Sequence, residues 1–253
     1  MSAWERFCRN KLALVAAVVV LLFIGAAIAA PILAPYDPAQ QFPEGLSLQG
    51  SPLPPDQRFW FGTDLLGRDL LSRLLYEARA SLLVGLVANS VAVLLGAFLG
   101  TLAGYTRGFS GELIMRFTDL MMAFPALLLA MPQGGLRKAL VKQQHVQAAS
   151  VGATHWQMLT WHLFPHLVPT ILVWGTLGIS TTVLQEATLS FLGVGVQPPT
   201  PSWGGIINES QSFLQSAPWL VIFPGLAILI LALAFNILGD GVRDALDPTE
   251  RNR

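Results

Sequence analysis

Four histidines form the group of residues whose types and spacing suggest metal chemistry. They lie in a single central stretch of the chain, at His145, His155, His162 and His166. The last two are one helical turn apart, and imidazole groups at that spacing can share a zinc ion. However, Pro165 disturbs the helix between them, no carboxylate lies nearby in the sequence, and no HExxH pattern occurs. We therefore expect no metal site and no cofactor in this chain.

Glu186 is the only charged residue in the apolar run of residues 166–196. An ionisable group in a membrane segment either belongs to a solute pathway or reaches toward interfacial water. We keep both interpretations and treat Glu186 as a candidate residue of a translocation pathway. A membrane enzyme would need acid, base or nucleophile groups that converge, and Glu186 alone does not supply them. The sequence therefore predicts no catalytic residue.

The composition indicates a membrane protein. Of the 253 residues, 53% are hydrophobic and only 12% are charged, which is more apolar content than a soluble core of this length needs. Basic and acidic residues balance at 15 each, so the net charge gives no sign of a nucleic-acid partner. The single cysteine, Cys8, excludes an internal disulfide. No GxxxxGK[ST] loop occurs, so if ATP drives this protein, another chain binds the nucleotide.

A polar stretch at residues 137–169 separates two apolar regions. Within it, Gln147 is followed by three small residues, Ala148, Ala149 and Gly152, which share one helical face. Such a face lets the surface of another protein come close. Thr154 and Gln157 then have the spacing of a capping box, which predicts that a second helix starts after Gly152. The stretch therefore predicts helix, turn, helix and membrane entry.

Four apolar runs are long enough to cross a bilayer, which takes about 20 residues: residues 12–36, 80–106, 166–196 and 217–238. Basic residues precede the first run, which places the N-terminus in the cytoplasm. A cleaved signal peptide is the alternative, because small residues occupy positions 26–30, but the run is long for a signal core. Gly96, Gly100 and Gly104 recur every four residues, a pattern typical of close helix contact in lipid.

Four strings resemble a known family, the permease subunits of ABC importers for dipeptides, oligopeptides or nickel. Residues 61–73 resemble the GTDxLGRDxxSR segment that precedes the second span in this family, and residues 190–204 and 236–248 resemble its later segments. Residues 147–152 resemble the EAAxxxG loop on which a cytoplasmic ATPase docks, with Gln147 in place of the usual Glu. We expect Asp64, Arg68 and Asp69 to be close enough to pair and fix this loop, and we interpret residues 61–73 as a structural turn that identifies the family, not as a substrate site.

The resemblance implies an all-α, polytopic permease of the bacterial inner membrane. It implies a second homologous permease subunit, two cytoplasmic ATP-binding subunits and a periplasmic or lipid-anchored substrate-binding protein as partners. ATP hydrolysis would lie in the separate subunits and would drive alternating access. The expected divisions are residues 1–36 (cytoplasmic N-terminus and first helix), 37–79 (periplasmic segment), 80–248 (permease core with a coupling loop at 137–166) and 249–253 (tail). The substrate cannot be chosen from the sequence.

The third span of the family is incomplete here. After Asp119 only about a dozen apolar residues precede Pro132, fewer than the roughly 20 that a crossing needs. A full third span would also place the basic loop at 137–166 outside, against the charge rule. We therefore expect four crossings, with residues 117–135 re-entrant or at the surface. The alternative is a chain that lost part of span three and all of span four, a degenerate or non-transporting scaffold or sensor.

Overall fold

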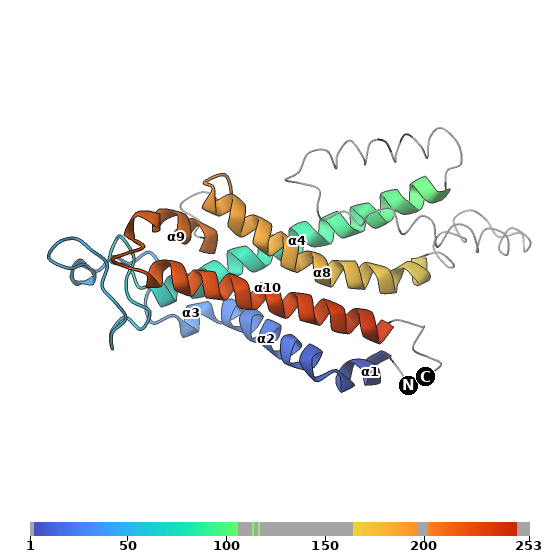
Figure 1. Cartoon of the computed structure of the whole chain (residues 1–253), viewed down its shortest axis with the longest axis horizontal. Coiled ribbons are helices and arrows are strands. Elements are labelled where there is room, and N and C mark those ends of the chain that lie inside the picture. Colours follow the sequence, from blue (N-terminus) through green and yellow to red (C-terminus); the bar gives the residue numbers. More distant parts are fainter. Residues whose placement is uncertain (1–2, 106–112, 114–115, 117–163, 197–201, 247–253) are drawn as a thin grey trace, which may run out of the picture.

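The computed structural model describes residues 3–105, 113, 116, 164–196 and 202–246, and these residues form a helical bundle (Figure 1). No strand occurs in this part of the chain, which agrees with the predicted all-α class. Its helices are α1 (Ala3–Arg9), α2 (Lys11–Ile28), α3 (Ala30–Leu33), η1 (Pro43–Gly45), α4 (Leu70–Tyr105), α8 (Phe164–Phe191), α9 (Trp203–Glu209), η3 (Gln211–Phe213) and α10 (Trp219–Leu246).

Among the described residues, four helices are long and apolar enough to cross a membrane: α2, α4, α8 and α10. Helices suit this role because each satisfies its own backbone hydrogen bonds, which lipid cannot do. Helix α8 packs against both α4 and α10, and α10 packs against α2. The short helix α9 lies against α8 and α10 at one end of the bundle (Figure 1). The four apolar runs predicted from the sequence thus correspond to four membrane helices.

Two helix boundaries differ from the sequence prediction. Helix α4 begins at Leu70, well before the uncharged run that starts at residue 80, so Arg73 and Glu77 lie inside a membrane helix. The sequence suggested that Glu186 is the only carboxylate in a span, but Glu77 is a second one. Helix α2 ends at Ile28, and the chain continues after Ala29 as the separate turn α3. Charged residues interrupt a hydropathy run without interrupting a helix when they are paired inside the bundle.

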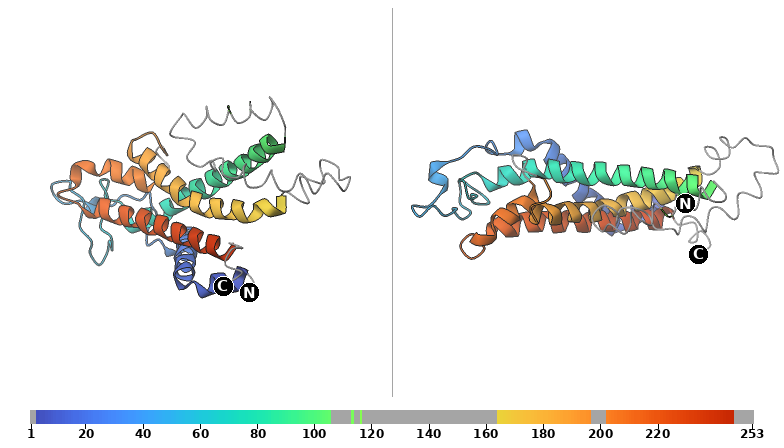
Figure 2. Two further views of the ribbon diagram at one scale, coloured as in Figure 1. Left: turned by 45° about the vertical axis from the view of Figure 1, so that its right-hand side comes forward. Right: turned by 90° about the horizontal axis from the view of Figure 1, so that it is seen from above.

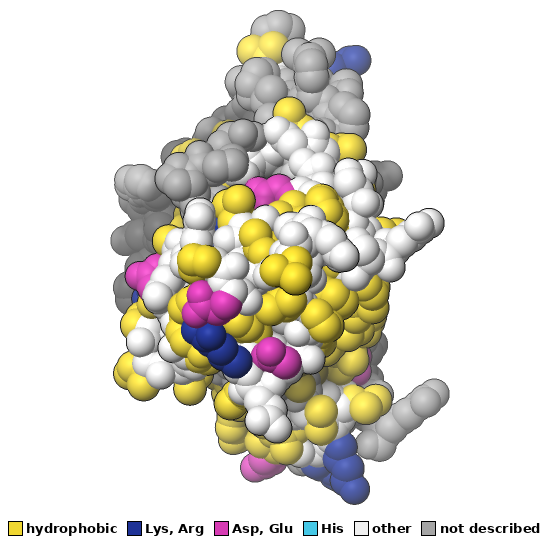
Figure 3. All heavy atoms as spheres, turned by 90° about the vertical axis from the view of Figure 1, so that its left-hand side faces the viewer, with side chains coloured by type: hydrophobic (Ala, Val, Ile, Leu, Met, Phe, Trp, Pro, Cys, Tyr) yellow, Lys and Arg dark blue, Asp and Glu magenta, His cyan; other side chains and the backbone are white. Residues whose placement is uncertain are grey.

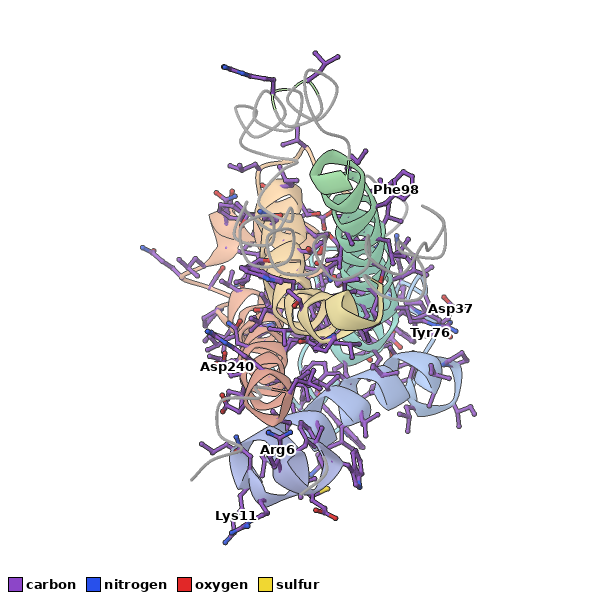
Figure 4. All side chains as sticks on the ribbon, turned by 90° about the vertical axis from the view of Figure 1, so that its right-hand side faces the viewer. Arg6, Lys11, Asp37, Tyr76, Phe98 and Asp240 are labelled. Atoms are coloured by element: carbon purple, nitrogen blue, oxygen red, sulfur yellow. The ribbon has the colours of Figure 1, made fainter. Side chains whose placement is uncertain are left out.

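The described N- and C-terminal ends of the chain lie together, at the end of the bundle opposite to α9 and residues 34–69 (Figures 1 and 2). Figure 4 looks onto this end and labels Arg6 and Lys11 there, together with Asp240 of α10. Basic residues mark the cytoplasmic side of membrane proteins, so the predicted cytoplasmic placement of the N-terminus applies to this end as a whole and stays a prediction. The chain leaves α4 and enters α8 at the same end (Figure 1), which fits the predicted side of residues 137–166. Of residues 137–166, the structure describes only 164–166, at the start of α8. Residues 117–135 and 249–253 also lie outside the described part.

Glycines set the close contact between α4 and α8. A Cβ atom at Gly85 of α4 would lie 2.6 Å from the Val183 Cγ2 of α8, and a Cβ at Gly178 of α8 would collide with the Asn89 Oδ1 of α4. In contrast, a Cβ at Gly100 would meet no atom within 4 Å. Among the described residues, Gly100 therefore makes no close helix contact. The contact expected for Gly96, Gly100 and Gly104 stays a prediction.

The Gly178→Ala substitution tests this crossing. We expect a loss of about 1–3 kcal/mol, because the added methyl group overpacks the contact with Asn89, measured as a lower unfolding midpoint of the purified protein in detergent. Gly175→Ala is the matched control, since a Cβ there meets nothing within 4 Å and alanine favours a helix by up to about 1 kcal/mol. Adding Asn89→Ala should recover part of the loss. Equal midpoints for the two alanine variants would show that the crossing is not close.

Candidate functional site

Residues 34–69 form a compact segment at the outer end of the bundle. Tyr36, Phe42 and Phe59 pack with ring centroids 4.9 to 5.8 Å apart, and the guanidinium of Arg58 lies 5.3 Å from the Phe42 ring centroid. Arg58 also donates to Glu44 at 2.8 Å, and the backbone hydrogen bond and this arginine lower the pKa of the exposed Glu44. The segment is therefore folded, with its own aromatic cluster.

Asp64 is the centre of the turn that the sequence analysis assigned to the family string. Its Oδ1 accepts from the backbone N–H of Leu66 at 2.8 Å and of Arg68 at 2.9 Å. Its Oδ2 accepts from the Arg68 Nε at 2.6 Å and from the Arg73 Nη1 at 2.5 Å. Gly67 has φ +70, a conformation that glycine adopts without strain. The predicted pairing of Asp64 with Arg68 is confirmed, and the turn acts as structure.

Asp69 begins α4 in the manner of an N-cap residue. Its Oδ2 accepts from the backbone N–H of Ser72 at 2.8 Å and from the Ser72 hydroxyl at 2.6 Å. The side chain is buried, and burial raises the pKa of Asp69, while the two bonds from Ser72 act in the opposite direction. The end of the outer turn and the start of the second membrane helix are thus fixed together.

Arg73 and Glu77 carry this charge network into the membrane helix. The Arg73 Nη2 lies 3.2 Å from the Glu77 Oε1, and both side chains are almost fully buried. The pair occupies successive turns of α4, because residues four apart share a helix face. Removing one partner of a buried pair is costly, since the other charge is left uncompensated. This pair was not predicted from the sequence, although its i, i+4 spacing is a readable signal.

Glu186 lies between α4 and α8 and is 6% exposed. Its Oε1 accepts from the Ser190 hydroxyl at 2.8 Å, and its Oε2 accepts from the Ser81 hydroxyl of α4 at 3.1 Å. The carboxylate therefore has hydrogen-bond donors from within this subunit. Its role in a translocation pathway stays a prediction, and its geometry makes it a link between two membrane helices.

Further polar contacts hold α8 to its neighbours. The Asn89 Nδ2 of α4 donates to the Gly175 carbonyl at 2.6 Å, and the Ser180 hydroxyl donates to the Ala232 carbonyl of α10 at 2.9 Å. Above them, the Trp203 Nε1 of α9 donates to the Leu74 carbonyl at 3.1 Å. The Asn89 and Ser180 bonds fix the rotation of α8 about its axis, because each requires a particular face of α8 to point at a particular neighbour, while the Trp203 bond ties α9 to α4.

The outer face of the molecule combines apolar and charged side chains. Figure 3 shows basic side chains beside acidic ones, surrounded by hydrophobic ones. The exposed hydrophobic residues of this end include Leu48, Trp60 and Leu66. Such a mixture is compatible with contacts to another protein, but it contains no group of three or more metal-ligating side chains among the residues that the structure describes.

The coupling residues predicted from the sequence, Gln147, Ala148, Ala149 and Gly152, lie outside the described residues. The same holds for three of the four histidines. His166 falls within α8, but its side chain is not among those described. Of the predicted site residues, the structure therefore places Glu186 alone.

The raised pKa of Asp69 gives a pH-dependent prediction. A raised carboxyl pKa means that the folded state binds the proton more tightly, so this stabilisation is present at pH below the ordinary value of 3.8 and is lost as the pH rises. Asp69→Asn should therefore gain stability relative to the unsubstituted protein as the pH goes from 4 toward 7. Asparagine caps a helix about as well as aspartate, whereas alanine costs about 1 kcal/mol.

The measurement is the unfolding midpoint of both proteins in detergent across this pH range, with Asp69→Ala as the variant that loses the cap at every pH. A difference between Asp69→Asn and the unsubstituted protein that does not change with pH would contradict the assignment.

Three curated relatives match almost the whole chain. The dipeptide transport system permease protein DppC of Alkalihalophilus pseudofirmus is 38% identical over 98% of this chain and 89% of its own length. The di/tripeptide transport system permease protein DppC of Pseudomonas aeruginosa is 39% identical over 98% and 92%. The glutathione transport system permease protein GsiD of Pectobacterium atrosepticum is 39% identical over 97% and 89%.

Two family models match different parts of the chain. The N-terminal TM domain of oligopeptide transport permease C covers residues 1–55, and the binding-protein-dependent transport system inner membrane component covers residues 133–252. The relatives are membrane subunits of transporters, so ATP hydrolysis lies in separate subunits, and a partner ATPase and a substrate-binding protein are implied. The chain belongs to the permease subunits of binding-protein-dependent ABC importers of the dipeptide and oligopeptide type, multi-pass proteins of the inner membrane.

Proposed function

We propose that this chain forms part of the membrane path of an importer for short peptides, with di- and tripeptides or glutathione as the substrate class. The observation that carries the proposal is the identity of 38–39% over nearly the whole chain to permeases named for these solutes. The degenerate scaffold, which was the alternative from the sequence, gains no support from relatives that are all named as transport permeases.

The proposed assembly contains a second homologous permease subunit, two cytoplasmic ATP-binding subunits and a periplasmic or lipid-anchored substrate-binding protein. The exposed faces of the spanning helices support the need for a membrane partner. Leu83, Val87 and Leu94 of α4 are 63%, 54% and 58% exposed in this subunit. A second permease subunit would cover some of these side chains, and lipid would cover the others.

Coupling to ATP hydrolysis is proposed to occur through Gln147, Ala148, Ala149 and Gly152. This part of the chain leads directly into α8, whose described residues begin at Phe164. Movement of α8 would reach α4 through the Ser81–Glu186 hydrogen bond and α10 through the Ser180–Ala232 hydrogen bond. We therefore propose that Glu186 serves the pathway as a positioning residue, by holding α8 in its orientation.

Peptide uptake tests the proposed function directly. Cells that lack their own peptide importers would receive this chain with its partner subunits, and labelled dipeptide, tripeptide and glutathione would be offered. We expect uptake that disappears when the partner ATPase is inactivated. Uptake of nickel instead of peptides would change the substrate class, and no uptake of any of these solutes would favour the non-transporting scaffold.

The same assay addresses the short central segment. The alignment with the first relative runs over 275 positions, more than the 253 residues of this chain, so some residues of the relative have no counterpart here. A version carrying a family-length insertion between Met131 and Leu136 is the comparison. Equal uptake by both versions would show that the short segment is a working element, whereas higher uptake by the longer version would show a functional deletion.

Gly152→Trp tests the coupling face. We expect weaker co-purification with the ATPase subunits and normal membrane insertion, because a bulky side chain blocks the close approach that a small-residue face permits. Leu214→Trp is the control, since Leu214 is 53% exposed in the outer turn between α9 and α10, far along the chain from the coupling residues. Unchanged co-purification of Gly152→Trp would count against the assignment of this face.

A further inference from the structure

The face of α8 that points away from α4 and α10 carries neutral polar side chains on successive turns. Thr181 and Thr188 are exposed, and Gln185 is partly exposed between them. Residues three and four apart lie on one side of a helix, so these three side chains form a single stripe. Bulky apolar residues flank the stripe: Trp174 and Leu184 of α8 are 44% and 43% exposed, and Leu192, which directly follows α8, is 65% exposed. We call these six residues the α8 outer face.

The orientation of this face is fixed from behind. Glu186 follows Gln185 in the sequence, but a helix turns by about 100° per residue, and Glu186 faces Ser81 of α4. Ser180 is fully buried against α10. The contacts that hold Glu186 and Ser180 therefore leave Thr181, Gln185 and Thr188 on the uncovered side of the helix.

The exposed faces of the other spanning helices are different in character. They consist mainly of large aliphatic side chains. Among the side chains that the structure describes, the exposed polar residues of α4 are Arg79 and Ser90, and those of α10 are Asn236, Asp240, Arg243 and Asp244, in its last turns. Leu21 of α2, Val91 of α4 and Leu233 of α10 are examples, at 66%, 50% and 51% exposure. Among the four described spanning helices, α8 is the one on which uncovered side chains that are polar and uncharged repeat over consecutive turns.

The hydrogen-bonding needs of this face are only partly met within the subunit. The Thr181 hydroxyl donates to the Gly178 carbonyl at 2.8 Å, and the Thr188 hydroxyl donates to the Leu184 carbonyl at 2.7 Å. Each hydroxyl oxygen keeps lone pairs that can accept a further bond. The Gln185 side chain has no hydrogen-bond partner among the described residues. An amide without a partner in hydrocarbon costs several kcal/mol, so lipid is a poor neighbour for it.

We propose that the α8 outer face lines the path of the transported peptide, with the Gln185 amide at its centre. This inference rests on the proposed function and deepens it. A primary amide and two hydroxyls offer donors and acceptors that match the N–H and C=O groups of any peptide backbone, while Trp174, Leu184 and Leu192 offer apolar contact to peptide side chains. Polar side chains also form hydrogen bonds between helices in lipid, but the bulk of Trp174, Leu184 and Leu192 beside the stripe keeps the backbone of a partner helix at a distance, so close helix packing is the weaker alternative.

The neutrality of this face suits transport. A solute must bind a pathway well enough to enter and weakly enough to leave. A charged side chain at Gln185 would attract one class of peptide termini and side chains and repel another. Hydrogen bonds from neutral groups discriminate little between peptides, which fits a substrate class defined by a shared backbone.

Cysteine labelling tests the placement. Single cysteines replace Thr181, Gln185 and Thr188 in a Cys8→Ser background, and the assembled transporter in membranes is treated with a hydrophilic, membrane-impermeant thiol reagent. Leu21→Cys and Leu233→Cys are matched controls on exposed apolar faces, and Leu48→Cys, in the fully exposed outer segment, is the positive control. We expect labelling of the three stripe positions that a dipeptide with its binding protein slows, and no labelling of the two apolar controls.

If Leu48→Cys is labelled and the three stripe positions are not, the α8 outer face is closed to water and the proposal is wrong. The proposal is equally wrong if Leu21→Cys and Leu233→Cys react as fast as the stripe positions.

A charge substitution tests the contact with solute. Gln185→Glu should shift the ratio of uptake of Ala-Lys to Ala-Glu by about tenfold in favour of Ala-Lys, the factor that corresponds to about 1.4 kcal/mol. Leu233→Glu on α10 is the matched control and should leave the ratio unchanged. An unchanged ratio in Gln185→Glu would exclude contact between this residue and the peptide.

These outcomes separate the inference from the proposed function. Peptide uptake by the unsubstituted transporter without labelling at the stripe refutes the pathway assignment alone. If the stripe positions are labelled but no peptide is taken up, the α8 outer face still lines a water-filled path, and the proposal that peptides are the substrate is wrong.

Discussion

Two serine hydroxyls make it possible for Glu186 to lie inside an apolar bundle. A carboxylate taken out of water loses favourable solvation, and only nearby donors can offset the loss. Ser190 supplies one donor from the next turn of α8, and Ser81 supplies the other from α4. The second bond exists only if α8 presents Glu186 to α4. The need to satisfy one carboxylate therefore determines how α8 is rotated, and through it which residues face outward.

A second set of charges organises the outer end of the bundle. Asp64 binds Arg68 and Arg73, and Arg73 also faces Glu77 inside α4. The outer segment is also tied to α10, since the Trp219 Nε1 donates to the Thr63 carbonyl at 3.4 Å. At the opposite end, α4 and α8 separate from each other (Figures 1 and 2). The subunit is thus held together at its outer end by these contacts.

The sequence predicted the spanning helices and the family, because apolar runs and the string at residues 61–73 are local features. It also predicted the pairing of Asp64 with Arg68, which lie one helical turn apart in the sequence. It did not predict that Arg73 and Glu77 belong to α4, since a hydropathy profile treats each charge as an interruption of the span. In the structure the charge of Arg73 is balanced by the carboxylates of Glu77 and Asp64, so the helix continues through these residues. Gln147, Ala148, Ala149 and Gly152 lie outside the described residues, so their role stays a prediction.

Gln185 shows why the pathway could not be located from the sequence. A charge in an apolar run, such as that of Glu186, is a clear signal in the sequence, whereas the neutral amide of Gln185 beside it is not. Whether a side chain of α8 is buried or exposed depends on α4 and α10, which are distant from it in the sequence. These two helices pack against the side of α8 that carries Glu186 and Ser180. A residue whose side chain is held by hydrogen bonds within the subunit, such as Glu186, is not available to bind the solute. In a helix of this kind, the charged side chain fixes the orientation, and the neutral polar residues on the opposite face are available to the peptide.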